Sequence, residues 1–140
     1  MDLTIKILLL FAGLFLLSGM LTGIWKYRKL LRLPEQSTPV HIDMAHHSSF
    51  FYSFACLVIA KLIEYSPFSP GVRFGIAALP LVYFSATIII YGAEGFLSQS
   101  EQLVSERGYV TQWFINGLAA GQIISLILIL YGFIYTQFFQ

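Results

Sequence analysis

The sequence predicts an all-α integral membrane four-helix bundle that forms a single domain over residues 1–140. Its composition is the first indication. Hydrophobic residues make up 57% of the chain and charged residues only 11%, whereas a soluble domain carries about 25% charged residues. The second indication is that apolar stretches suited to the ~20-residue helix that crosses a bilayer occur four times along the chain.

Transmembrane helices are expected at about 3–25, 43–65, 72–96 and 113–135. The first stretch is longer than the apolar part of a signal peptide, and basic residues follow it, so we expect a retained helix. Two prolines within residues 66–70 separate the second and third helices, because proline cannot continue a helix. Pro80 lies inside the third helix and is expected to kink it.

Basic residues predict the orientation of the chain. Four of them follow the first helix directly: Lys26, Arg28, Lys29 and Arg32. Loops rich in lysine and arginine tend to stay in the cytoplasm. Residues 26–38 and 97–112 are therefore expected on the cytoplasmic face of a multi-pass protein, with both termini outside the cytoplasm.

Polar residues gather at the start of the second helix. Pro39 suits a first helical turn, with Ser37 or Thr38 as its cap. Asp43 lies three residues before His46 and four before His47, so it can reach both on one helix face. A carboxylate next to imidazoles can bind a divalent metal or hold a proton acceptor. The candidate ligand or proton site comprises Asp43, His46, His47, His41 and Glu94.

Other interpretations of these side chains stay open. The histidines can instead lie at the level of the lipid headgroups and bond to water, phosphate or loop backbone. His41 lies two residues from Asp43 and points away from it on a helix. Glu94 is a candidate partner for a basic residue of the first loop. Asp43, His46 and His47 are the only weak metal candidates.

No cofactor is expected. A haem between two histidines needs ligands on facing helices, and all three histidines lie within seven residues at the start of one helix. A bis-histidine haem inside one chain is therefore disfavoured, although a homodimer could supply a second ligand. The single cysteine, Cys56, excludes an intramolecular disulfide.

Two GxxxG motifs predict close helix packing. They are Gly19 to Gly23 in the first helix and Gly117 to Gly121 in the fourth. Small residues four apart let two helix backbones approach each other. The first and fourth helices are expected to pack on each other, or either one to form a subunit interface.

Three segments resemble a group of small bacterial inner-membrane proteins that carry no assigned activity: residues 22–27, 43–46 and 49–55. This resemblance implies a location in the bacterial inner membrane. The overall plan also resembles the MAPEG family of glutathione- and eicosanoid-processing enzymes, which have four helices and a basic loop after the first. The Arg/Asn/Glu pattern of the second MAPEG helix is absent from residues 45–52, so that resemblance extends to architecture alone.

The expected function is that of a small membrane protein without evident catalytic machinery. It would act as an oligomeric or accessory subunit, or as a binder of a hydrophobic ligand. The alternative is a membrane enzyme or a redox or metal-binding subunit that uses the His/Asp cluster. A transporter is disfavoured because no charge lies clearly at mid-membrane. Expected partners are lipids, other membrane subunits and copies of the chain; the net charge of +1 indicates no nucleic acid.

Overall fold

The computed structural model describes residues 2–32, 40–97 and 109–139 of the chain. These residues fold into four α-helices, which confirms the predicted all-α class. The helices are α1 (Leu3–Arg32), α2 (Val40–Glu64), α3 (Pro70–Leu97) and α4 (Tyr109–Phe138). The predicted cap residues Ser37 and Thr38, and Pro39 with them, lie outside the described residues.

Three helical stretches are long and apolar enough to cross a membrane: Leu3–Arg32, Pro70–Phe96 and Asn116–Phe138. Within the described part of the chain, α2 does not qualify, although all four helices were expected to. Its length of 25 residues is sufficient. Three histidines, Asp43 and several serines in its first half lower its mean hydropathy.

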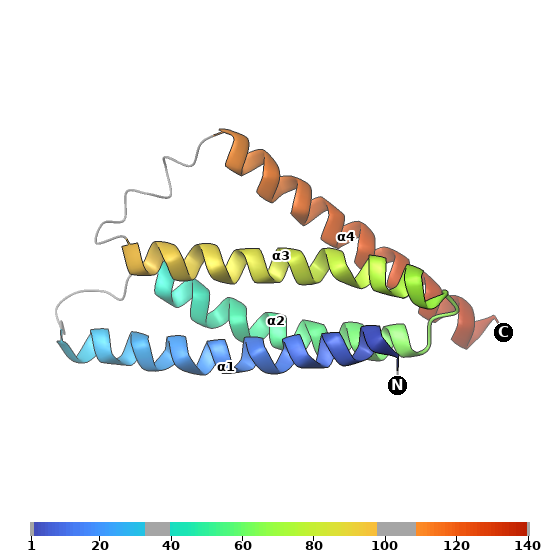
Figure 1. The fold of residues 1–140 in the computed structure, drawn as a ribbon, viewed down its shortest axis with the longest axis horizontal. Coiled ribbons are helices and arrows are strands. Elements are labelled where there is room, and N and C mark those ends of the chain that lie inside the picture. The colour runs from blue at the N-terminus through green and yellow to red at the C-terminus, as the bar shows by residue number, and fades with distance from the viewer. Residues whose placement is uncertain (1, 33–39, 98–108, 140) are drawn as a thin grey trace.

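The helix α2 lies at the centre of the bundle, in contact with the three others. Figure 1 shows α1, α2 and α3 running side by side. The helix α4 diverges from α3, and the separation of the two helices grows toward the N-terminal end of α4. The Tyr52 ring of α2 stacks on the Phe84 ring of α3, with 4.2 Å between ring centroids. Around this stack lies a core with residues from all four helices, among them Leu8, Phe15, Cys56, Ile59, Ile63, Leu81 and Ile129. The described helix that lacks a sufficiently apolar stretch is thus the one that lies at the centre of the bundle.

The first GxxxG motif lies at the contact between α1 and α2. A Cβ atom on Gly19 would lie 3.0 Å from the Phe50 ring, and one on Gly23 would lie 2.8 Å from Cε1 of His46. The Ser53 hydroxyl adds a 2.8 Å hydrogen bond to the carbonyl oxygen of Ala12. The close partner of α1 is therefore α2, rather than α4 as one of the two expectations had it.

The second GxxxG motif is not closely packed. Among the described residues, no atom lies within 4 Å of a Cβ built on Gly117, and the nearest to one on Gly121 is a Leu79 methyl group at 3.8 Å. Instead, α4 is held through its C-terminal half. The Ser125 hydroxyl donates to the carbonyl oxygen of Ile76, and a Cβ on Gly132 would lie 2.7 Å from the Phe68 ring.

Leucine substitutions in the two GxxxG motifs should therefore have different effects on stability. Leucine at Gly23 should push α1 from α2 and lower the free energy of unfolding in detergent by about 1–3 kcal/mol, the usual cost of overpacking. Gly117→Leu is the matched control and should leave the unfolding midpoint unchanged. Equal midpoints for the wild type, Gly19→Leu and Gly23→Leu would contradict the close α1–α2 contact.

Candidate functional site

Lys26 and Asp43 form an ion pair that joins the end of α1 to the start of α2. The Lys26 ammonium donates to Oδ1 of Asp43, and Nδ1 of His47 lies 3.4 Å from the same oxygen. Asp43 lies in the first turn of α2, outside the apolar run that starts at Phe50.

The His46 ring meets the His47 ring edge-on, with centroids 5.3 Å apart, but its Nδ1 turns away from the Asp43 carboxylate that the sequence spacing placed within reach. Its Nδ1 lies 2.8 Å from the carbonyl oxygen of Gly19, across the α1–α2 contact. In the tautomer with hydrogen on Nδ1, this atom donates to that oxygen. The His46 ring also meets the Phe50 ring edge-on, with centroids 5.1 Å apart. Because Gly19 and Gly23 have no Cβ, the His46 ring has room to pack directly against α1.

His41 finds a partner that spacing within α2 could not predict. Its Nδ1 lies 3.0 Å from Oε2 of Glu94 on α3, and the His41 side chain is only 4% exposed. The two atoms lie at ion-pair distance, but among the described residues Nδ1 of His41 has no hydrogen-bond partner. A signal was nevertheless present, because His41 lies just before the second predicted helix and Glu94 near the end of the third, so both belong at the same end of the bundle.

Further contacts hold the C-terminal end of α3 to α1 and α2. A Cβ on Gly95 would lie 2.9 Å from Cγ1 of Ile42, so α2 and α3 approach closely there. The Trp25 ring of α1 lies 6.1 Å from the Phe96 ring, centroid to centroid. The His41–Glu94 contact thus sits inside a tightly packed helix junction.

A crevice opens between α3 and α4, and no sequence motif indicated it. Its free volume, including the mouth, is about 380 Å³. The two helices are joined near Ser125 and Ile76, and on the N-terminal side of that joint α4 leaves α3 (Figure 1). Five lining residues come from α3 and two from α4: Tyr83, Ala86, Thr87, Ile90, Tyr91, Phe114 and Leu118.

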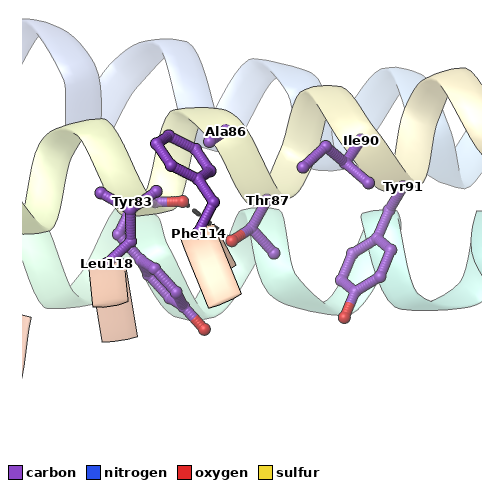
Figure 2. Close-up of a pocket in the computed structure, with 7 residues that line it drawn as sticks. All are labelled: Tyr83, Ala86, Thr87, Ile90, Tyr91, Phe114 and Leu118. Atoms are coloured by element: carbon purple, nitrogen blue, oxygen red, sulfur yellow. Dashed lines mark hydrogen bonds between the residues drawn. The ribbon is translucent and has the colours of Figure 1, made fainter. Parts of the chain in front are cut away.

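The lining of the crevice is neutral and rich in aromatic rings. Figure 2 shows Tyr83, Thr87 and Tyr91 along α3, with Phe114 and Leu118 reaching in from α4. The α3 residues recur every four positions and therefore share one helix face. The Thr87 hydroxyl donates a 2.8 Å hydrogen bond to the carbonyl oxygen of Tyr83. The Tyr52 hydroxyl of α2 is hydrogen-bonded to the side chains of Thr87 and Tyr83.

Metal chemistry finds little support in these contacts. Across the ranges that the structure describes, no three His, Cys, Asp or Glu side chains are placed to hold one ion. Asp43 and His47 approach each other while His46 turns to α1. Lys61 and Glu64 form an ion pair at the C-terminal end of α2, with 2.8 Å between Nζ and Oε2. The crevice is therefore the better candidate site.

No protein-family model matches the chain, and neither a curated protein nor a solved structure matches it significantly. The two resemblances drawn from the sequence consequently stay predictions.

The ion-pair geometry makes a prediction about coupling. A double-mutant cycle of Lys26→Met with Asp43→Asn should give a coupling free energy of about 0.3–1 kcal/mol at pH 7, as for partly exposed pairs. The same cycle for Asp43→Asn with His46→Gln should give a smaller coupling, because Nδ1 of His46 bonds to the carbonyl oxygen of Gly19.

The measurement is the free energy of unfolding of the detergent-solubilised protein. A coupling between Asp43 and His46 as large as that between Asp43 and Lys26 would contradict the separation of the two groups.

Proposed function

We propose that this chain is a bacterial inner-membrane protein that crosses the membrane four times and binds a hydrophobic ligand between α3 and α4. The observation that carries the proposal is the neutral crevice formed where α4 diverges from α3. Ligand pockets are typically concave and mostly apolar, with a few polar groups that fix orientation. The crevice combines these features.

The position of α2 supports a fourth crossing. A helix of 25 residues spans about 37 Å at 1.5 Å per residue, more than the ~30 Å hydrocarbon layer. Its polar side chains turn largely to other helices: His41 to α3, and His46 and Ser53 to α1. Polar groups that face the interior of a bundle are tolerated in a membrane.

The composition of the crevice supports an uncharged ligand. None of its seven lining residues is Asp, Glu, Lys, Arg or His, so a charged ligand would lose its hydration without gaining a counter-charge. Two lining residues come from α4, whose N-terminal half packs loosely: the Phe114 side chain is 61% exposed. In a membrane, the mouth of such a crevice would face lipid, which gives an apolar ligand direct access.

The alternative function, a redox or metal-binding subunit built on Asp43, His46 and His47, has weaker support. Asp43 and His47 approach each other, whereas Nδ1 of His46 bonds to the carbonyl oxygen of Gly19 on α1. The proposed homo-oligomer remains a prediction that rests on the sequence alone.

Orientation can be tested by single-cysteine labelling. In a Cys56→Ser background, cysteine at Gln36 or Gln102 should be protected from a membrane-impermeant maleimide in intact cells and should react after lysis. The expected protection follows from the basic residues at the end of α1. Labelling of either site in intact cells would reverse the proposed topology.

Ligand binding can be tested by filling the crevice. Two neutral probes, 1-dodecanol and decylubiquinone, would be added to detergent-solubilised protein while the thermal unfolding midpoint is followed. At ten to a hundred times its dissociation constant, a ligand stabilises the native state by about 1.4–2.7 kcal/mol. At least one probe should therefore raise the midpoint of the wild type.

Ala86→Trp should abolish that rise because the indole occupies the crevice, and Leu118→Trp should do the same from the α4 wall. Val82→Trp is the matched control, since Val82 is 52% exposed on α3 and outside the lining. If no probe shifts the wild type, or if the filled variants respond like the control, the proposed binding site is wrong.

A further inference from the structure

The C-terminal end of α1 carries three basic side chains without an acidic partner among the described residues. Of the four basic residues there, Lys26 is paired with Asp43. Arg28, Lys29 and Arg32, here called the basic surface, form no ion pair within the described ranges. Arg28 and Arg32 are exposed, and this end of α1 extends beyond the first turn of α2 and the last turn of α3 (Figure 1). The basic surface is therefore open to an anionic partner.

The acidic residues near this end of the bundle leave the basic surface charged. Glu94 lies against His41, as Asp43 lies against Lys26. The loops outside the described residues add three acidic residues and one basic residue to the chain, namely Glu35, Glu101, Glu106 and Arg107. An experiment on the basic surface therefore needs the full chain.

An apolar stripe on α1 leads directly to the basic surface. Leu14, Leu17, Leu21 and Ile24 are 48%, 53%, 58% and 52% exposed. They follow one another at steps of three or four residues, and Arg28 is the next step. Such steps keep the side chains on one helix face. The stripe is thus an outward apolar face that ends in a guanidinium group.

The length of this stripe matches one leaflet of a bilayer. From Leu17 to Arg28 the helix rises about 16 Å, and half of the ~30 Å hydrocarbon layer is about 15 Å. An acyl chain can therefore lie along the stripe while its phosphate lies beside Arg28. The Lys29 ammonium lies 5.7 Å from the centre of the Trp25 ring, and tryptophan is typical of the same membrane interface.

The chemistry of the basic surface favours an anionic headgroup. Arg28 and Arg32 are one helical turn apart and share a face. A guanidinium group can bind a phosphate through two parallel hydrogen bonds. A zwitterionic headgroup places its own cation next to the phosphate, whereas an anionic headgroup keeps a net charge that the basic surface can compensate.

We propose that the C-terminal end of α1 binds an anionic phospholipid, with Arg28 and Arg32 on its phosphate and an acyl chain along the stripe from Leu17 to Ile24. Lys29, held next to Trp25, adds a third positive charge. This inference rests on the proposed location in a membrane and is independent of ligand binding between α3 and α4.

The test compares two lipids with the same acyl chains. Palmitoyl-oleoyl phosphatidylglycerol is anionic, and palmitoyl-oleoyl phosphatidylcholine is zwitterionic. Each is titrated into the detergent-solubilised full chain, and apparent dissociation constants come from the dependence of the unfolding midpoint on lipid concentration. Phosphatidylglycerol should bind the wild type at least tenfold more tightly. Its advantage should shrink at high salt, because the Debye length falls from about 10 Å at 0.1 M to about 3 Å at 1 M ionic strength.

Charge-removing variants locate the binding surface. Arg28→Gln and Arg32→Gln should each weaken phosphatidylglycerol binding about fivefold, which corresponds to about 1 kcal/mol for each basic residue near the surface. Combined with Lys29→Gln, they should abolish the preference for the anionic lipid. Lys6→Gln is the matched control, because it removes one positive charge from an exposed position at the other end of α1. This variant should keep the wild-type affinity.

Three results would overturn the inference. The first is equal affinity of the wild type for the two lipids. The second is an equal loss in Lys6→Gln and Arg28→Gln, since total charge alone would then decide binding. The third is that inorganic phosphate at the same concentration stabilises the wild type as much as phosphatidylglycerol does, because the surface would then bind phosphate from solution without a lipid.

The crevice variant Ala86→Trp keeps the two proposals apart. It should lose the response to 1-dodecanol and decylubiquinone and keep the preference for phosphatidylglycerol. Loss of that preference in Ala86→Trp would place the lipid at the crevice and overturn the inference. Failure of every crevice probe on the wild type contradicts the proposed function alone, and the preference for phosphatidylglycerol should then persist.

Discussion

The shape of the molecule depends on how α3 is fastened at its two ends. Toward its C-terminal end, His41 and Ile42 of α2 contact Glu94 and Gly95 directly. Toward its N-terminal end, the carbonyl oxygen of Ile76 accepts a hydrogen bond from α4. The C-terminal end of α3 is thus bound to α2, whereas its N-terminal part is bound to α4. A crevice between α3 and α4 is the geometric result.

Hydroxyl groups make many of the helix-to-helix hydrogen bonds in this bundle. Ser53 bonds to the backbone of α1, and Ser125 bonds to the backbone of α3. A serine hydroxyl is small enough for the helices to approach, and it carries no charge that would need a partner in an apolar interior. Ionised side chains concentrate at helix ends, as Lys26, Asp43 and the Lys61–Glu64 pair show. This division leaves the middle of the bundle neutral.

The number of helices could be predicted because long apolar stretches are a local property of the sequence. Their pairing could not. The motif at Gly117 has the same spacing as that at Gly19, yet only Gly19 meets a neighbouring side chain closely. Periodicity specifies which residues share a face, whereas the partner of that face is set by contacts along the entire helix.

The candidate site shows the same limit. The spacing of Asp43 and His47 within one helix correctly placed them together, because four residues complete about one turn. The spacing within α2 also allows the His46 ring to reach Asp43. The ring lies instead against Gly19, which is 27 residues away in sequence. The crevice has no sequence signature, since its walls are ordinary apolar faces that became a site only because two helices diverge.

The helix α3 links the polar end of the bundle to the crevice. Tyr91 lines the crevice, and Glu94, less than one turn further along the same helix, contacts His41. A helical turn is too stiff for these two residues to move independently, because the intervening backbone is hydrogen-bonded. The contact that fixes Glu94 against α2 therefore also fixes the position of the Tyr91 wall.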